Sequence, residues 1–278
     1  MKRNSALLLV LSLMMALVSV FGCDGGSTGV CTSTTSVSGA GASELYYPCS
    51  GSGALPATTM TSGFMGTDEQ VSWLARDVAG NGFVVLAMTP LNPMGMVSGW
   101  RDAHRAGIAK LRELNTSGVL RGRIDTTKLQ TCGHSKGGGG ALWASSTLGS
   151  QLKSTIGMAP WQEEFLSLSG IRSATLIQAG ALDTLATVVM TANEYNLLPT
   201  GISKGYFQYT TADHMSWATM GTNHSSISQD VVAWMKYYLK GDTSQRTTLN
   251  SGLGKTVNTW VDLGPDGGSS SSSSGGCN

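Results

Sequence analysis

Residues 129–144 read Leu129-Gln130-Thr131-Cys132, then Gly133-His134-Ser135-Lys136-Gly137, then three more glycines and Ala141-Leu142-Trp143-Ala144. A strand-like run therefore passes through a glycine-flanked serine into the small residues that begin a helix. This is the G-x-S-x-G pattern of a nucleophile elbow, which exposes the serine on a sharp turn between a strand and a helix. The pattern recurs at 25–29, but there it lies in a Gly/Ser/Thr-rich stretch with neither element. Ser135 is therefore the candidate nucleophile.

Strand-like and helix-like stretches alternate on both sides of this motif. Strands are expected at 57–61, 83–88, 128–132, 155–159, 174–179 and 206–210. Helices are expected from a capping-box signal at Thr67 and Gln70, and at 98–115, 137–147, 188–198 and 227–239. Such alternation predicts an α/β fold with a mostly parallel central sheet flanked by helices on both faces. In folds of this kind, catalytic residues lie on loops at the carboxyl ends of strands.

A serine hydroxyl needs an imidazole to accept its proton, and the chain has four histidines. His214 follows the 206–210 strand by a short loop, which places it at a carboxyl strand end. His224 is the weaker alternative, because it directly precedes two serines that look like a helix cap. His104 lies among charged residues of the 98–115 helix and is expected on its solvent face. His134 is expected to be turned by the elbow towards the substrate cleft.

The third catalytic group must be a carboxylate that orients the imidazole. Asp183 lies on the turn after the 174–179 strand, between Ser135 and His214 in the chain. The order Ser, Asp, His is that of the α/β-hydrolase fold and differs from the chymotrypsin and subtilisin orders. Asp213 is a rival, but a neighbour of the histidine in sequence usually points away from it. The glutamates at 163 and 164 follow a different strand.

The tetrahedral intermediate of acyl transfer needs two backbone N–H donors. One is expected from Lys136, the residue after the nucleophile. The other is expected from the loop after the first predicted strand, where Phe64 is the candidate and its ring would form a wall of the acyl site.

Several blocks of this chain resemble bacterial cutinases and poly(ethylene terephthalate) hydrolases over roughly residues 45–248. These blocks are 62–67, 80–85, 133–140, 159–161 and 232–236. Asp183 and His214 fall where that family keeps its acid and base. The resemblance implies hydrolysis of carboxylic esters without a cofactor or metal, on aromatic walls that include Trp161. That tryptophan could alternatively be plain core.

The expected substrate-binding residues are Phe64, His134, Trp161 and Leu185. Two residues beside the site depart from the family's pattern. Lys136 stands where the family usually has Met, and Met215 follows the catalytic histidine where Phe or Ser is common. The cysteine pair with which some polyesterases tie the acid and base loops is absent. These differences leave the ester chemistry intact and the polymer preference open.

The chain has 278 residues and a formal charge of +1, so no excess of charge favours nucleic acid as a partner. Residues 1–22 have the layout of a signal peptide, with two basic residues before an apolar run too short to span a bilayer comfortably. Residues 23–43 are expected to be a tether, 44–264 one catalytic domain, and 265–278 a Ser/Gly-rich tail. The protein is expected to be exported, either secreted or anchored at the bacterial envelope through a lipidated Cys23.

The other cysteines are interpreted for an oxidising compartment. Cys31 and Cys49 could form a disulfide that fastens the N-terminal arm to the domain, and Cys132 is expected to be a buried free thiol. Cys277 is unassigned. No Cys or His spacing indicates a metal site.

The sequence thus predicts a monomeric, exported serine ester hydrolase that acts through an acyl-enzyme on Ser135. Short-chain esters and polyesters, including aromatic ones, are the expected substrates. A triacylglycerol lipase or general carboxylesterase is the alternative within this class, although no long apolar lid insertion is visible. The alternative from another class is a non-catalytic surface binding lipoprotein on a hydrolase scaffold.

Overall fold

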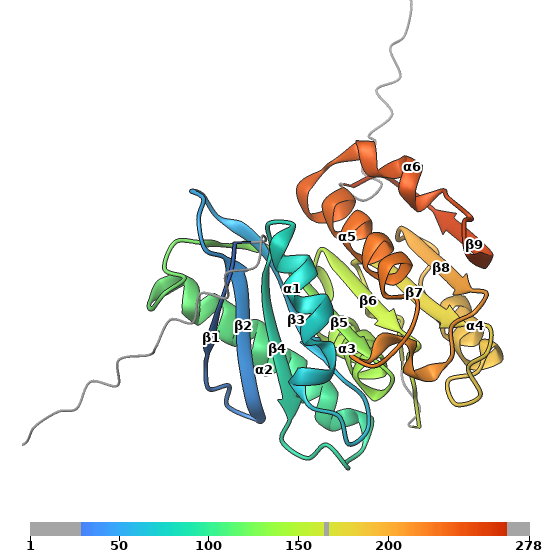
Figure 1. Ribbon diagram of the computed structural model, residues 1–278, viewed down its shortest axis with the longest axis horizontal. Coiled ribbons are helices and arrows are strands. Elements are labelled where there is room, and N and C mark those ends of the chain that lie inside the picture. Colours follow the sequence, from blue (N-terminus) through green and yellow to red (C-terminus); the bar gives the residue numbers. More distant parts are fainter. Residues whose placement is uncertain (1–28, 164–166, 266–278) are drawn as a thin grey trace, which may run out of the picture.

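A computed structural model describes residues 29–163 and 167–265. The predicted signal peptide, Cys23 and Cys277 lie outside these residues, as does all of the tail except Pro265. A single mixed sheet runs through the described part of the chain, with the strand order β1-β2-β4-β3-β5-β6-β7-β8-β9 (Figure 1). None of the helices in these ranges is long and apolar enough to cross a bilayer.

The strands are β1 Val30–Thr34, β2 Ala40–Pro48, β3 Leu55–Thr61, β4 Val84–Pro90, β5 Ile124–His134, β6 Ser154–Met158, β7 Ala174–Gly180, β8 Lys204–Tyr209 and β9 Lys255–Val261. The α-helices are α1 Ser72–Gly80, α2 Val97–Thr116, α3 Lys136–Leu148, α4 Val188–Leu197, α5 His224–Lys240 and α6 Arg246–Leu249. Strands β4-β3-β5-β6-β7-β8 pair in parallel, whereas β1, β2 and β9 join by antiparallel pairing. The predicted α/β class and mostly parallel sheet are confirmed.

The strands are buried on both faces because helices cover both. Helices α1 and α5 cover one face, and α2, α3 and α4 cover the other (Figure 1). Strand β4 shows the two-residue period that follows from this arrangement: Val85 and Ala87 pack with α1 and α5, while Val84, Leu86 and Met88 pack with α2. Strand β4 is therefore a near-continuous apolar run, whereas the other central strands bury Thr, Ser and Gln side chains among their apolar residues.

The predicted tether at 23–43 is wrong for residues 30–43, which form β1 and most of the first half of β2. Because this stretch is rich in Gly, Ser and Thr, its sequence did not indicate the two strands. A disulfide stabilises their pairing. The predicted Cys31–Cys49 disulfide is present, and the Cys49 amide donates to the Gly29 carbonyl at 2.7 Å. Closing a loop of 18 residues removes chain entropy from the unfolded state, a contribution of about 3 kcal/mol. The disulfide thus supports an edge that has little apolar surface to bury.

The capping box at Thr67 is not formed. Thr67 occupies the N-cap, but its hydroxyl accepts no capping hydrogen bond, and the amide of Gln70 donates to the Thr67 carbonyl instead. The chain first makes a 3₁₀ turn at Asp68–Val71 and only then enters α1. Sequence analysis also missed α6 and β9.

His104 is fully buried, so its predicted place on the solvent face of α2 is wrong. Its Nδ1 lies 2.8 Å from the Thr59 hydroxyl, and its Nε2 lies 3.0 Å from the Thr61 hydroxyl and 3.2 Å from the Gly137 carbonyl. Because a carbonyl can only accept, Nε2 carries the proton. The ring is neutral and joins α2, β3 and the start of α3, and burial lowers its pKa to about 4.

We therefore expect acid to destabilise the fold through His104. The unfolded chain takes up a proton below about pH 6.5 that the folded ring cannot hold until about pH 4, so stability falls as the pH drops through this window. At pH 5 this cost is roughly 2 kcal/mol relative to pH 7.5. In urea unfolding at both pH values, His104→Gln should lose about that much less stability on acidification than the wild type.

Thr59→Val is the matched control, since it removes a hydrogen bond to the ring and keeps the buried imidazole. It should be less stable at both pH values with an unchanged difference between them. An equal acid-induced loss in His104→Gln and wild type would contradict the assignment.

Candidate active site

Ser135 occupies the turn between β5 and α3, in a backbone conformation that non-glycine residues rarely adopt (φ 56°, ψ −125°). The turn is possible because its neighbours lack side chains. A Cβ on Gly133 would lie 2.3 Å from the Gly137 carbonyl oxygen, and one on Gly137 would lie 2.5 Å from the Ser62 carbonyl oxygen. The G-x-S-x-G spacing is thus a steric requirement of this turn.

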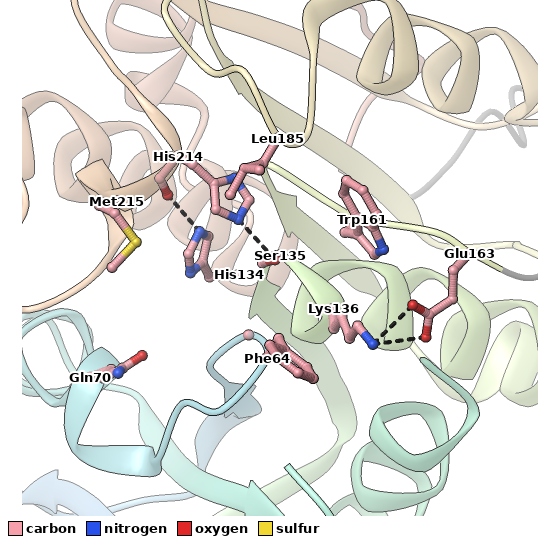
Figure 2. A pocket seen from close by; sticks show the side chains of 11 residues that line it. Phe64, Gln70, His134, Ser135, Lys136, Trp161, Glu163, Leu185, His214 and Met215 are labelled. Carbon is pink, nitrogen blue, oxygen red and sulfur yellow. Dashed lines mark hydrogen bonds and ion pairs between the residues drawn. The ribbon is translucent and has the colours of Figure 1, made fainter. Parts of the chain in front are cut away.

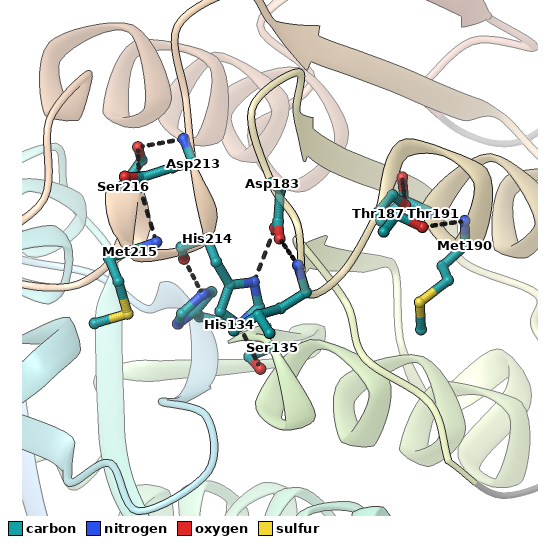
Figure 3. Close-up of polar contacts among 11 residues, drawn as sticks. His134, Ser135, Asp183, Thr187, Met190, Thr191, Asp213, His214, Met215 and Ser216 are labelled. Atoms are coloured by element: carbon teal, nitrogen blue, oxygen red, sulfur yellow. Dashed lines mark hydrogen bonds and ion pairs between the residues drawn. The ribbon is translucent and has the colours of Figure 1, made fainter.

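Ser135, His214 and Asp183 form one hydrogen-bonded line (Figure 3). The Ser135 Oγ lies 2.9 Å from His214 Nε2, and His214 Nδ1 lies 2.8 Å from Asp183 Oδ2. A carboxylate can only accept, so Nδ1 carries the proton and Nε2 is free to accept the proton of the hydroxyl. The other Asp183 oxygen accepts from the Leu185 amide at 2.8 Å. The side chain of Asp183 is fully buried, whereas that of His214 is 12% exposed.

The three residues meet because parallel strands end together. Ser135 follows β5, Asp183 follows β7 and His214 follows β8, at the same edge of the sheet. The rivals lie elsewhere. Asp213 caps the 3₁₀ turn His214–Trp217 and binds the Met215 amide and Ser216 rather than the imidazole (Figure 3).

His224 also lies apart from the nucleophile. It is the first residue of α5, with Asn223 at the N-cap, so the cap predicted at the two serines that follow is wrong. Its ring stacks on Trp73 with centroids 3.7 Å apart, and its Nε2 donates to the Ala218 carbonyl. Its role is to hold the far end of the His214 loop.

The predicted oxyanion donors lie on either side of Ser135. Phe64 belongs to the loop after β3, and Lys136 is the first residue of α3. Their amides take part in none of the turn, loop and cap hydrogen bonds among the described residues. The loop is fixed by its neighbours, because the Met65 amide donates to the Pro93 carbonyl and the Gly66 amide to the Gly63 carbonyl. Both candidate amides therefore border the nucleophile without a backbone partner in the described part of the chain.

A cleft of about 400 Å³ opens above the Ser135 hydroxyl (Figure 2). It is lined by Gly63, Phe64, Gln70, His134, Ser135, Lys136, Trp161, Glu163, Leu185, His214 and Met215. All four predicted substrate-binding residues are among them. Trp161 lines the cleft and also packs against the core, so both interpretations of this residue hold. Gln70 and Glu163 were not predicted, and Met215 was noted only as a departure from the family's pattern.

His134 forms part of the cleft wall and supports the His214 loop. Its Nε2 donates to the His214 carbonyl at 2.8 Å, and its ring stacks on Trp217 with centroids 5.9 Å apart. Burial, together with the nearby His214, lowers the pKa of His134 to about 3. The ring is therefore a neutral donor.

A polar network behind Trp217 continues this support into the core. Gln178 accepts from the Trp217 indole at 3.0 Å and donates to the Tyr209 hydroxyl at 2.7 Å. Tyr209 donates to Asp230, which forms an ion pair with Lys255 of β9 at 2.9 Å. Burial raises the pKa of Asp230, and the adjacent Lys255 ammonium opposes that shift. The loop that carries the imidazole is thus coupled to the last strand.

Lys136 does not extend into the cleft as a free charge. Its Nζ forms an ion pair with Glu163 at 2.9 Å, donates to the Gly95 carbonyl at 2.9 Å and lies 4.8 Å from the centre of the Phe64 ring. Glu163 also accepts from the Val97 amide at the start of α2. The pair joins three loops around the nucleophile. A lysine beside a catalytic serine was the available signal that a carboxylate partner should exist.

No group of three or more His, Cys, Asp or Glu side chains within residues 29–163 and 167–265 is arranged to hold a metal ion. The free thiol of Cys132 is buried, as expected, and burial raises its pKa.

A strained serine turn, an imidazole and a buried carboxylate on a mostly parallel sheet define the protein as an α/β-hydrolase. The model of the PET hydrolase-like family (PETase) matches residues 17–259, and the chain belongs to this family. It is a carboxylic ester hydrolase of the serine hydrolase type.

Similar proteins agree with this membership. Cutinase 1 of Thermobifida cellulosilytica is 32% identical over 212 residues, which cover 76% of this chain and 78% of that protein. A cutinase of Thermobifida fusca strain YX is also 32% identical over 212 residues, covering 76% and 68%. A bis(hydroxyethyl) terephthalate hydrolase of Streptomyces coelicolor is 30% identical over 213 residues, covering 76% and 66%.

We expect the Lys136–Glu163 pair to contribute to stability. Glu163→Gln leaves a mostly buried ammonium without its counter-charge and should lower the free energy of unfolding by about 2 kcal/mol. The double variant Lys136→Met/Glu163→Gln removes both charges and should recover most of that loss. Urea unfolding of the two single variants and the double variant measures the coupling.

The Arg105–Asp102 pair, with both side chains 52% exposed, provides the control, and Arg105→Gln should change stability by less than about 0.5 kcal/mol. Additive effects of the changes at 136 and 163 would show that the pair is not coupled.

Proposed function

We propose that this chain is an exported serine esterase that hydrolyses short-chain carboxylic esters and polyesters through an acyl-enzyme on Ser135. The observation that carries the proposal is the unbroken hydrogen-bonded line from the Ser135 hydroxyl through His214 to Asp183, at the base of an open cleft. The family membership and the relatives named as cutinases and as a terephthalate ester hydrolase support the choice of substrate.

In the first half of the reaction, His214 Nε2 takes the proton as Ser135 Oγ attacks the ester carbonyl. Asp183 keeps the imidazole in the required tautomer and stabilises the imidazolium that forms. The proton then passes to the departing alkoxide, and the acyl group remains on Ser135. In the second half, water loses a proton to His214 and attacks the acyl carbonyl. The bond to Ser135 Oγ then breaks, His214 returns the proton to Oγ, and the acid is released.

The carbonyl oxygen becomes negative in both tetrahedral intermediates. The amides of Phe64 and Lys136 flank the hydroxyl and have no backbone partner among residues 29–163 and 167–265, so they can donate to this oxygen. The Lys136 ammonium is held by Glu163 and Gly95, which leaves its backbone N–H as the group offered to the substrate.

The cleft walls favour apolar or aromatic acyl units. Phe64 is 49% exposed and Leu185 is 55% exposed, and both border the Ser135 hydroxyl together with Trp161 (Figure 2). An ester chain can lie between these side chains with its carbonyl over the serine. A triacylglycerol lipase remains the alternative, and it is distinguished by preference for long acyl chains.

Export is supported by the layout of residues 1–22 and by the Cys31–Cys49 disulfide, which suits an oxidising compartment. Mass spectrometry of the mature N-terminus separates the two routes. A lipid-modified Cys23 would show an anchored enzyme, and an unmodified N-terminus would show a secreted one. An intact residue 1 after expression in a secreting bacterial host would contradict export.

Ser135→Ala should lower kcat/KM on p-nitrophenyl butyrate by about 10⁴-fold or more, since the nucleophile is lost. Ser27→Ala alters the serine of the second G-x-S-x-G pattern and should leave this activity unchanged. The wild type should also release soluble products from polyester film and act more slowly on p-nitrophenyl palmitate than on the butyrate. If Ser135→Ala kept its activity on p-nitrophenyl butyrate, the proposed mechanism would be wrong. A preference for the palmitate ester would favour the triacylglycerol lipase alternative.

A further inference from the structure

Exposed methionines gather at one edge of the molecule. Of the described methionines, the exposed ones are Met65, Met94, Met96, Met215 and Met220, with exposed fractions from 51% to 97%. Each belongs to a loop that follows a strand at the carboxyl edge of the sheet: Met65 after β3, Met94 and Met96 after β4, and Met215 and Met220 after β8. We call these five residues the methionine rim.

The rim borders the cleft. Met215 lines the cleft itself, and so does Phe64, the neighbour of Met65 in the chain (Figure 2). Hydrogen bonds join the loops into one surface: the Met65 amide donates to the Pro93 carbonyl, and the Thr219 hydroxyl donates to the carbonyls of Glu69 and Gln70. The exposed Leu182 and Leu185, from the loop after β7, extend the same surface.

Large apolar side chains are concentrated here rather than scattered. Ten of the fifteen exposed large hydrophobic residues among those described belong to these four loops or to the first turn of α4. Clustered apolar surface on a water-soluble protein usually marks a contact site, whereas single exposed apolar residues need no explanation.

The same loops are almost without charge. The ranges 62–67, 91–96, 181–187 and 210–223 contain no Lys or Arg, although the chain has eighteen. Their acidic residues are Asp183, which is buried against His214, and Asp213, which caps a turn. The exposed Glu69 lies next to the first range, and the charges of Lys136 and Glu163 in the cleft compensate each other in an ion pair. An anionic membrane would be met by basic side chains, and a charged protein partner by opposite charge. This surface matches an uncharged apolar one.

We propose that the methionine rim is the surface by which the enzyme attaches to a water-insoluble, uncharged polyester, with the cleft at its centre. The inference rests on the proposed function and adds a docking surface to it. Methionine suits this task because its unbranched, polarisable side chain can fit an irregular surface without a fixed shape of its own. Attachment through the rim brings ester groups of the solid above Ser135.

The experiment measures adsorption separately from catalysis. In a Ser135→Ala background, Met94, Met96 and Met220 are changed together to Gln, which keeps the side-chain length and adds polarity. These three residues lie outside the cleft lining. Adsorption to poly(ε-caprolactone) particles should weaken about tenfold, because apolar contact area is lost. With Ser135 intact, the same triple variant should hydrolyse soluble p-nitrophenyl butyrate within twofold of wild type.

Two controls define the result. The matching triple change to Leu keeps the surface apolar and should adsorb as the parent does. Val119→Gln/Val261→Gln alters exposed apolar residues at the opposite edge of the sheet, where Val261 pairs with the first residue of β8, and should also adsorb as the parent does. Equal adsorption by the Gln triple variant and the parent would overturn the proposal, as would an equal loss in the Val119/Val261 control.

A third part of the experiment tests whether the rim binds an uncharged lipid membrane instead of a polyester. If the Gln triple variant loses binding to phosphatidylcholine vesicles and not to polyester particles, the occupant is a lipid surface and the proposal is wrong. Failure of the proposed function has a different signature, since it would appear as soluble-ester activity that survives Ser135→Ala.

Discussion

The turn at Ser135 is the constraint on which the rest of the site depends. A non-glycine residue with φ near 56° is held there only because the surrounding structure fixes it. The Ser135 amide donates to the Met158 carbonyl, and the Ser135 carbonyl accepts from the amides of Gly139 and Trp161. The hydroxyl is thus oriented by β6, by α3 and by the loop that carries a wall of the cleft. Gly133 and Gly137 allow the backbone of strand, turn and helix to come this close, so the geometry of each of the three depends on the other two.

Much of the fold and the triad could be predicted because each element left a local signal. The central strands are buried on both faces and uncharged over most of their length, and three residues of the right chemistry follow three of them. Parallel packing alone therefore brings Ser135, Asp183 and His214 together. The predictions failed where stability comes from distant partners. β1 looks like a linker because a disulfide, rather than apolar burial, secures its edge. His104 looks like a surface residue because the groups that satisfy its ring lie on β3 and at Gly137.

The residues beside the triad illustrate the same limit. Lys136 could be identified from the sequence, but Glu163 could not, because only the folded chain brings the loop after β6 to the start of α3. Once paired, the lysine no longer presents a free charge to the substrate. It binds the Gly95 carbonyl and lies over the Phe64 ring, so a polar residue at this position supports an apolar wall. Lys136 in place of the family's usual Met looks disruptive in the sequence, but the fold accommodates it through one ion pair with Glu163.

The buried ion pair of Asp230 and Lys255 limits where the chain can be truncated or fused to another protein. β9 lies at the edge of the sheet, where a designer would trim the chain or insert a fusion junction. Cutting there would remove the ammonium from a buried carboxylate and strip the antiparallel partner from β8, the strand that leads into the His214 loop. Through Tyr209 and Gln178 the damage would reach the indole that backs His134. Carriers and immobilisation tags therefore belong beyond Val261, with the whole of β9 left intact.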